Sequence, residues 1–495
     1  MVLAADDYRM QTLTTRYQTQ DIKLPAPAEG TLPLPRQIEL YIAAIDVALG
    51  ALVNAVLHDP VFQRTEASWR GLYQLVMNTE TGEMLKLRVL NVRESELRDD
   101  LKQAIDKDQS QLFKKLYEEE YGTFGGSAFG VLLYDKEFGR SPGDVEFLTS
   151  LSGVAAAAHA PLVAAASPGL FDLPQADASR PDFTRLGAPR DLAKIFEAID
   201  MAGWRSFRAS EDSRYVTLVL PRVLARLPYG AATNPVEGMN FEEDVEVLGS
   251  TELFYDFRAT GDGEAAARPK AHAKYLWATA VWALGERITE AFALYGWCAA
   301  IRGVEGGGIV PGLPLHTFKT PDGETVAKIP TEVSITDRRE KELNDLGFIA
   351  LCYCKGSDYA CFFGGATTQK PVVYTNPEAS QNAQASALLP YVLAASRFAH
   401  YIKKIGRDKV GSFQTRGTLE KYLNNWIADY VLLNDDAPQS AKARYPLREA
   451  RIDVTEVPGK VGAYNATVFL RPHFQLEELT ASIRLVAHIP PPAAA

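Results

Sequence analysis

The chain has 495 residues and a formal net charge of −10, with 46% hydrophobic and 23% charged residues. This acidic balance argues against a general nucleic-acid binder, because phosphate binding needs a basic face, and four cysteines are too few for a disulfide framework. The N-terminus lacks the pattern of a secretory signal, and the alanine-rich stretch 153–171 is interrupted by prolines. We therefore expect a cytoplasmic protein of several domains that does not insert into a membrane.

Residues 1–36 are polar and then proline-rich, which predicts an extended N-terminal arm. The arm is either a disordered tail or a partner-binding segment. Residues 37–58 follow as an amphipathic helix that ends at His58-Asp59-Pro60. Its apolar positions alternate spacings of four and three, the pattern of a coiled-coil-like seam: Ile38, Ile42, Ile45, Leu49, Leu52 and Val56. The seam packs either on its own domain or against a helix of a partner subunit, and we take these six residues as the partner-binding candidates.

Beyond this helix, strand-like and helix-like segments interleave. In chain order the sequence predicts a helix at 69–77, a strand at 85–92, a helix at 95–120, buried strands at 131–134 and 215–220, helices at 142–158 and 273–298, strands within 347–363, helices at 386–405 and 417–433, strands at 466–470 and 482–486, and a disordered tail at 490–495. This order predicts an α/β (mixed α+β) class, with mixed sheets flanked by helices.

Motifs for catalysis are weak. The glycine-rich segment 122–130 lacks both the Lys-Ser/Thr ending of a phosphate loop and the spacing of a nucleophile elbow around Ser127. The glycines at 303–308 follow a predicted helix, whereas a phosphate cradle precedes one. Cys352, Cys354 and Cys361 lack metal-ligand spacing, and the histidines are scattered. We therefore expect no catalytic, cofactor-binding or metal-binding residues; the alternative is a cytosolic enzyme that uses one of the two glycine-rich loops.

The most uneven charge lies between Arg397 and Lys421, where seven Lys or Arg residues face two acidic ones, a net charge of +5. On a helix, Phe398, Ile402 and Ile405 would share an apolar face, opposite a basic one. The basic face either meets solvent only or steers the chain toward an acidic partner.

Several long segments, taken together, resemble one family closely. They are Trp69-Arg70-Gly71-Leu72-Tyr73, Tyr121-Gly122-Thr123-Phe124-Gly125-Gly126, Leu220-Pro221-Arg222-Val223-Leu224-Ala225-Arg226-Leu227-Pro228-Tyr229-Gly230, Trp297-Cys298-Ala299-Ala300-Ile301-Arg302-Gly303-Val304-Glu305-Gly306-Gly307, and Phe469-Leu470-Arg471-Pro472-His473-Phe474-Gln475-Leu476-Glu477-Glu478-Leu479. The chain resembles, from about residue 37 to 489, the large subunit of the contractile sheath of bacterial type VI secretion (the TssC/VipB type). It departs from the family at Phe124, where a proline is expected, and in the pair Cys352 and Cys354.

The resemblance implies a contractile tail-sheath-like fold and a structural role without catalysis. It implies a small sheath subunit (TssB/VipA-like) as partner, a helical polymer of heterodimers around an Hcp-type tube, a baseplate, and a ClpV-type ATPase that recycles the sheath. It also implies an outer and middle sheath domain at 59–375 and an inner, tube-facing domain at 376–489. On this basis the tube-contact candidates are Lys403, Lys404, Arg407 and Lys409; the competing assignment gives the same charges to neighbouring sheath subunits.

Overall fold

The computed structural model describes residues 2–4, 33–173, 182–245, 272–319, 325–409, 412, 415–434, 436–458 and 463–473. Its centre is an eight-stranded sheet in the order β2-β1-β3-β4-β5-β11-β12-β8. The strands run, in that order, Val89–Asn91, Val2–Ala4, Leu132–Phe138, Leu162–Ala166, Val216–Leu220, Phe348–Tyr353, Tyr359–Phe362 and Ile309–Pro311. Neighbours from β2 to β11 are parallel, and β12 pairs antiparallel with both β11 and β8. The predicted mixed α/β class is thus confirmed.

Alternate residues of the central strands supply two hydrophobic cores, one on each face of the sheet. Leu162, Leu218 and Phe348 belong to the first core, which α6 (Pro142–Ala158) and α8 (Ala202–Ala209) cover. Val163 and Val219 belong to the second, under α3 (Pro60–Met77) and α10 (Val281–Tyr295). Because both faces are covered, β4 and β5 are buried along their whole length.

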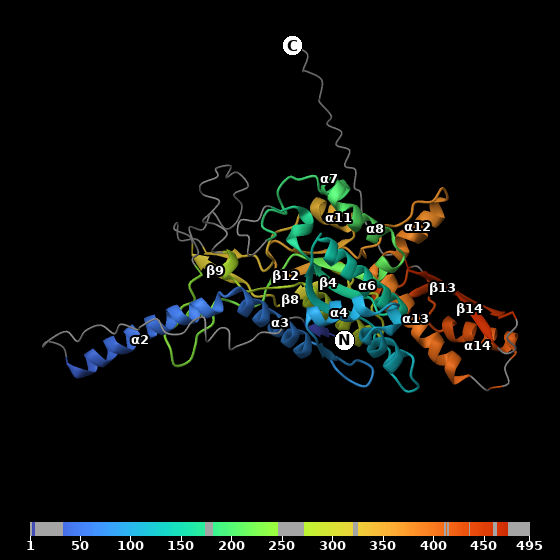
Figure 1. The fold of residues 1–495 in the computed structure, drawn as a ribbon, viewed down its shortest axis with the longest axis horizontal. Helices are drawn as coiled ribbons and strands as arrows, with labels where there is room; N and C mark the ends of the chain where they lie inside the picture. Colours follow the sequence, from blue (N-terminus) through green and yellow to red (C-terminus); the bar gives the residue numbers. More distant parts are fainter. Residues whose placement is uncertain are drawn as a thin grey trace, which may run out of the picture.

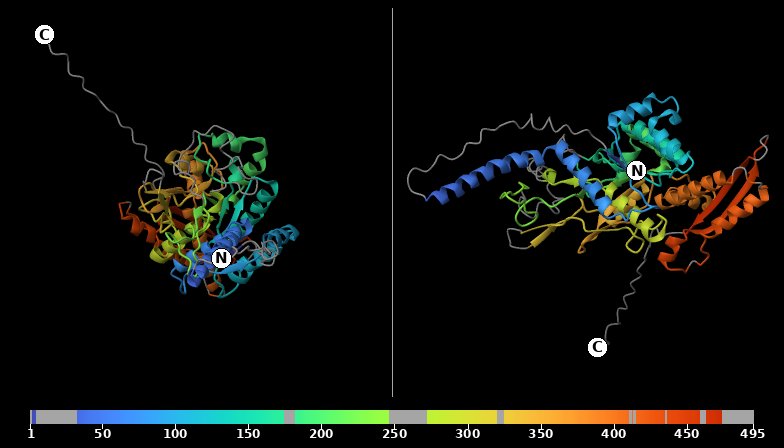
Figure 2. Two further views of the ribbon diagram at one scale, coloured as in Figure 1. Left: turned by 90° about the vertical axis from the view of Figure 1, so that its left-hand side faces the viewer. Right: turned by 90° about the horizontal axis from the view of Figure 1, so that it is seen from below.

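The N-terminal helix α2 (Leu34–Leu57) projects from this body as an arm (Figure 1), and the view from below in Figure 2 shows the same projection. The next helix, α3, begins directly after it, because the Asp59 carboxylate caps it by accepting hydrogen bonds from the amides of Val61 (2.9 Å) and Phe62 (3.3 Å). Helix α3 lies tightly against α10: a side chain at Gly71 would collide with the indole of Trp282.

The C-terminal part forms its own small core at the opposite end of the molecule from α2 (Figure 1). It contains α12 (Pro377–Ser386), α13 (Leu389–Asp408), α14 (Arg416–Ala428), α15 (Gln439–Arg444) and the antiparallel hairpin of β13 (Leu447–Glu456) and β14 (Tyr464–Pro472). Phe398 of α13, Ile427 of α14 and Ile452 of β13 meet in this core, together with Trp297 from the loop after α10. The apolar face expected for the 386–405 helix is therefore confirmed at Phe398, with Ile402 and Ile405 packed at the edge of the core.

The other described elements connect these layers. They are α4 (Glu94–Gln103), η1 (Lys107–Gln109), α5 (Gln111–Phe113), the π-helix η2 (Lys114–Tyr121), η3 (Pro168–Phe171), α7 (Leu192–Glu197), η4 (Ile199–Met201), η5 (Asp212–Tyr215), β6 (Val223–Leu224), β7 (Trp277–Ala278), β9 (His316–Lys319), β10 (Thr325–Lys328) and α11 (Asp337–Asp345).

Several predicted elements were wrong in extent; the helix expected at 69–77 begins at Pro60, and the one expected at 417–433 ends at Ala428. The helix expected at 95–120 is divided, because the Asp100 carboxylate accepts hydrogen bonds from the amides of Gln111 (2.8 Å) and Leu112 (3.1 Å) and so starts a new helix. The helix expected at 273–298 begins only at Val281, since Trp277 pairs in β7 with β6. The strand expected at 85–92 is reduced to Val89–Asn91. Strand 466–470 lies within β14, whereas 482–486, the tail 490–495 and most of the arm 1–36 lie outside the described residues.

Candidate assembly surfaces

The apolar seam of α2 lies on the surface. Five of its six predicted positions are exposed, and Val56 is half-buried. The opposite side of the helix is also open, with Val47 75% exposed, and within α2 the structure buries Leu57. The described part of the chain therefore does not cover the seam.

By length and composition, α2 is also the described helix that could cross a membrane: its most apolar 18-residue window has a mean hydropathy of 2.1 and is 6% buried. A signal sequence and the core helix of a soluble protein can meet the same two criteria, so length and composition alone are weak evidence for a membrane span. Mean hydropathy also ignores the alternation of spacings four and three, which is the feature typical of a helix that packs on another helix.

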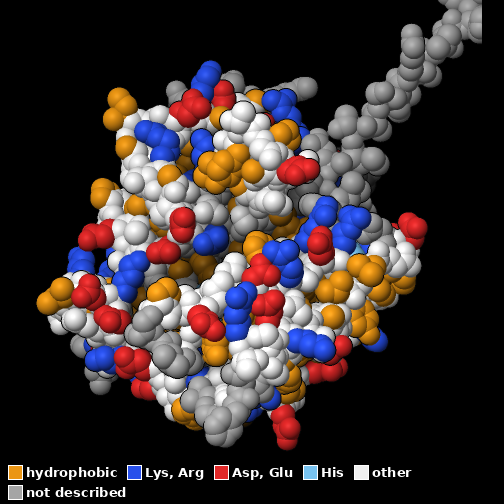
Figure 3. All heavy atoms as spheres, turned by 90° about the vertical axis from the view of Figure 1, so that its right-hand side faces the viewer, with side chains coloured by type: hydrophobic (Ala, Val, Ile, Leu, Met, Phe, Trp, Pro, Cys, Tyr) orange, Lys and Arg blue, Asp and Glu red, His pale blue; other side chains and the backbone are white. Residues whose placement is uncertain are grey.

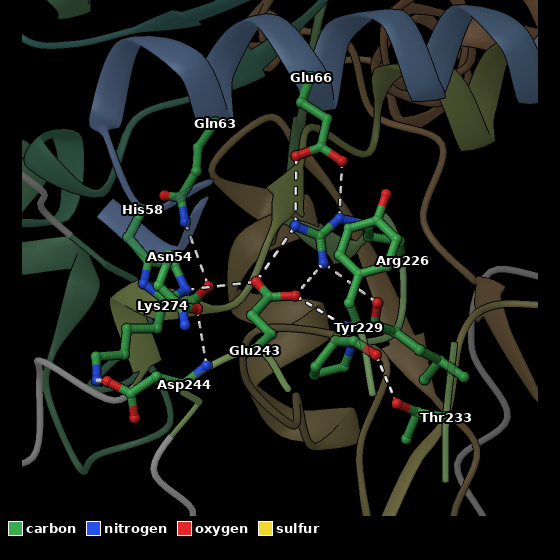
Figure 4. A network of polar contacts seen from close by, with 12 residues as sticks. Asn54, His58, Gln63, Glu66, Arg226, Tyr229, Thr233, Glu243, Asp244 and Lys274 are labelled. Carbon is green, nitrogen blue, oxygen red and sulfur yellow. Dashed lines mark hydrogen bonds and ion pairs between the residues drawn. The ribbon is translucent and has the colours of Figure 1, made fainter. Parts of the chain in front are cut away.

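A network of buried charges fixes the root of α2 (Figure 4). The guanidinium of Arg226 donates hydrogen bonds to Glu66 of α3 (Nε to Oε1, 2.7 Å) and to Glu243 (Nη1 to Oε2, 2.6 Å). Glu243 also accepts a hydrogen bond from the amide of Tyr229 (2.9 Å) and lies 3.4 Å from the imidazole of His58, directly after α2. Segment 226–245 is thereby joined to the junction between α2 and α3.

The electrostatics of this network favour the charged forms. Burial disfavours the Arg226 guanidinium, yet its bonds to Glu243 and Glu66 raise its pKa above the ordinary value. Burial also opposes ionisation of Glu243, but its bonds to His58 and Arg226 lower the pKa of this carboxyl. One turn before the junction, Asn54 accepts a hydrogen bond from the amide of Asp244 (2.9 Å). The base of helix α2 is therefore held by paired charges and amides rather than by a flexible linker.

The four tube-contact candidates differ in their surroundings. Lys403 lies between two rings of η2: its Nζ is 3.7 Å from the Tyr121 ring centroid and donates a hydrogen bond to the Tyr117 hydroxyl (2.8 Å). Arg407 donates a hydrogen bond to the Thr123 carbonyl (3.0 Å). Lys409 lies over the Tyr422 ring at 4.4 Å, whereas Lys404 is exposed. The structure brings Lys403 and Arg407 together against segment 114–124 and leaves Lys404 facing outward.

An aromatic cluster supports Lys403 from behind. His400 Nε2 lies 3.0 Å from the Ala158 carbonyl at the end of α6, and His159 Nδ1 lies 3.0 Å from the Tyr215 hydroxyl. Burial, helped by neighbouring positive charges, lowers the pKa of His400 to about 4. Burial also raises the pKa of Tyr121 to about 12. His400 and Tyr121 are neutral near pH 7, so neither ring adds a charge beside Lys403.

The hairpin presents a third surface. One edge of β14 pairs with β13, and among the described strands none pairs with its other edge. Beside the hairpin lies a groove of about 920 Å³, lined by α12, the first turns of α13 and the two strands. Figure 3 shows this end of the molecule, where the surface is hollowed and hydrophobic side chains lie among charged ones of both signs. An unpaired edge beside a groove has the form of a site for an added strand.

The glycine-rich loop at 303–308 is structural in these surroundings. Gly303 donates its amide hydrogen to the Phe362 carbonyl (2.7 Å), and Gly308 donates to the Gly303 carbonyl (2.8 Å), so these amides are not free to bind a phosphate. Burial raises the pKa of the Cys361 thiol to about 12, and that of Cys352 above its usual range, which makes both unreactive. Among the described residues no group of three or more His, Cys, Asp and Glu side chains could hold a metal ion.

Sequence reasoning missed the Arg226 network and the Tyr117–Tyr121 cage. In both, residues about 160 to 290 positions apart meet in space, for example Arg226 with Glu66 and Lys403 with Tyr117. Periodicity gives no signal for such pairs. The closely spaced Arg222 and Arg226 beside a buried strand were the available hint, since arginines are rarely buried without a carboxylate partner.

Comparison with known proteins identifies the family. Residues 39–369 match the family model described as EvpB/VC_A0108, tail sheath N-terminal domain, and residues 378–489 match the EvpB/VC_A0108, tail sheath gpW/gp25-like domain. The chain is 47% identical over 461 residues to the type VI secretion system sheath protein TssC1 of Pseudomonas aeruginosa, covering 92% of this chain and 86% of that protein.

Among solved structures, the chain is similar to a chain of the anti-feeding prophage baseplate (TM-score 0.38, 10% identity, 83% of this chain and 84% of that chain). It is also similar to the contracted PVC sheath complex (TM-score 0.36, 8% identity, 72% and 70%). Structural similarities at these scores do not identify a family, so the family assignment depends on the sequence matches over nearly the whole chain. The chain therefore belongs to the family of large subunits of the type VI secretion contractile sheath, which are structural proteins and not enzymes.

Proposed function

We propose that this sheath subunit pairs with a small sheath subunit (TssB/VipA-like) through the seam of α2, and that the heterodimers polymerise in the cytoplasm around an Hcp-type tube. The observation that carries the pairing is the exposed seam. A soluble protein rarely leaves so long an apolar stripe open to water unless a partner covers it. Burying a single Leu or Ile side chain contributes about 1.5–3 kcal/mol, so the stripe is sufficient for a stable contact.

The geometry at the root of α2 supports the same proposal. A projecting helix loses less conformational entropy on binding when its base is already fixed, and the bonds among Arg226, Glu66 and Glu243 fix it. The partner would then dock on a preformed helix. The proposal also keeps α2 out of the membrane, since the small subunit covers its apolar side chains.

We further propose that the inner domain, 376–489, holds the tube through the basic face of α13, with the outer and middle domain at 59–375 around it. Surface charge pairs are individually weak, about 0–1 kcal/mol each. When many such pairs repeat around a ring, their energies add up to a stable contact, and each single pair is easily broken when the sheath contracts. The open edge of β14 would accept a strand from the predicted arm, 1–36, of a neighbouring subunit, from the part that lies between β1 and α2, and so join the polymer. A baseplate and a ClpV-type recycling ATPase complete the proposed partners.

The pairing is tested by co-expression with the small subunit. Leu49→Asp with Leu52→Asp would place two carboxylates in the seam, and we expect co-purification of the two subunits to be lost. The matched control is Ile199→Asp, because Ile199 is 92% exposed and lies on η4, away from the seam. Co-purification of the double variant at normal yield would show that the seam does not bind the small subunit.

A further inference from the structure

The glycine-rich loop after η2 displays one aromatic side chain. Phe124 is 74% exposed and belongs to none of the hydrophobic cores of the described residues. Other aromatic side chains of the described residues fill the hydrophobic cores, for example Trp204 and Phe348. The Phe124 side chain therefore adds nothing to the packing of these cores.

The loop holds Phe124 in place. The Thr123 hydroxyl donates to the Glu118 carbonyl (2.5 Å), and the Gly126 amide donates to the Thr123 carbonyl (3.2 Å). After the turn, the Ser127 amide donates to the Glu120 carboxylate (2.8 Å). Gly125 has a φ of +77°, which a side chain would strain. The turn is therefore preorganised, and a partner would not need to order it.

Helix α13 supplies positive charge directly beside the ring. The Arg407 guanidinium lies 5.7 Å from the Phe124 ring centroid and binds the Thr123 carbonyl next to it. Lys404 is one turn before Arg407 on the same helix, at the three-residue spacing that places side chains side by side. The aromatic ring, the guanidinium and the exposed ammonium thus form one surface, which we call the Phe124 surface.

We propose that Phe124 is the apolar anchor with which the basic face of α13 docks onto an acidic protein surface that has an apolar socket. The complementary partner must be acidic because, within the described part of the chain, neither Lys404 nor Arg407 forms an ion pair with a carboxylate, and the chain as a whole has a net charge of −10. Aromatic and arginine side chains at the centre of a contact typically carry most of its binding energy, with the surrounding charges setting orientation. This inference rests on the proposed function, in which that partner is the tube; it adds the residue that makes the contact specific.

The test measures binding of purified tube rings to the heterodimer for four variants: Phe124→Ala, Phe124→Trp, Lys404→Ala and the control Ile199→Ala, whose side chain is exposed elsewhere. We expect Phe124→Ala to weaken binding at least tenfold with an unchanged salt dependence, because it removes apolar contact and no charge. Phe124→Trp should bind within a few-fold of the parent chain. Lys404→Ala should lower the salt dependence, because a screened charge pair is lost, and Ile199→Ala should have no effect.

The outcomes separate the two claims. Wild-type binding by Phe124→Ala, with weakened binding by Lys404→Ala, overturns the anchor and leaves the tube contact of α13 standing. Wild-type binding by both overturns the anchor and the tube contact together. Loss of sheath assembly by Phe124→Ala, with unchanged tube binding by the heterodimer, overturns the anchor as a tube contact, because the ring then faces a neighbouring sheath subunit.

Discussion

Replacing Arg226 with methionine should loosen the root of α2 without disturbing the rest of the molecule. The substitution keeps an unbranched apolar stem but removes the guanidinium. Glu243, whose side chain is 1% exposed, then keeps only the imidazole of His58 nearby, whereas Glu66, at 13%, keeps its ion pair with Arg70. Removing one partner of a buried ion pair costs about 3–5 kcal/mol, because the remaining charge stays buried. Since a tenfold change in an equilibrium corresponds to about 1.4 kcal/mol, local opening should become at least about a hundredfold more frequent.

Hydrogen exchange followed by mass spectrometry, with the chain co-expressed with the proposed small subunit, measures this opening directly. The informative amides include Tyr229 and Asp244, which bind Glu243 and Asn54 respectively. Protection should fall in segments 54–66 and 226–245 and persist in strands β4 and β5. Arg338→Met is the matched control, because its ion pair with Glu342 is on the surface, with Arg338 90% exposed, and such pairs contribute about 0–1 kcal/mol.

The effect should also depend on pH. In the parent chain the pKa of Glu243 is lowered, so the bonded carboxylate stabilises the fold above the ordinary pKa and this contribution is lost as the pH falls. Without Arg226 the buried carboxyl should prefer its neutral form, so mild acid should lessen the defect in Arg226→Met. Unchanged protection in both segments of Arg226→Met would refute the clamp at the root of α2.

Four further outcomes are expected. The pKa of His400 is lowered to about 4 from an ordinary 6.5, so between these pH values the unfolded chain binds a proton that the folded chain does not. Hydrogen-exchange protection of α13 should therefore fall as the pH drops from 6.5 to 4, and should fall less in His400→Asn. An identical pH profile in that variant would contradict the assignment. Gly71→Ala should lower stability by about 1–3 kcal/mol through its collision with Trp282, measured as a lower melting temperature, whereas Gly82→Ala, with nothing within 4 Å, should not. The purified complex should hydrolyse no nucleotide, and any turnover that Ser127→Ala abolished would revive the enzyme alternative. Replacing residues 5–30 with a Gly/Ser linker of the same length keeps β1 in the central sheet and should leave heterodimers but no long sheaths under the electron microscope; full-length sheaths from that variant would exclude the strand-adding arm.

Local patterns predicted much of this fold. The spacing of Ile38 to Val56 located α2, and the apolar run at 215–220 located a strand buried on both faces. Patterns failed where a side chain competed with the helix, as Asp100 does when it caps the amides of Gln111 and Leu112. Composition indicated neither the order of strands in the sheet nor the partners of Arg226 and Lys403, because those contacts join distant segments. The basic face of α13 could be predicted as a set of charges, but its division into caged Lys403 and exposed Lys404 required the position of η2.

The most direct measurement of the central claim is electron microscopy of the chain co-expressed with its small subunit, beside the variant Leu49→Asp with Leu52→Asp. The parent pair should form long hollow cylinders if, as proposed, the α2 seam joins the two subunits and the edge of β14 joins the heterodimers. The variant should form none. Cylinders of normal length and number from the variant would contradict the account, since they would show that the sheath assembles without the seam.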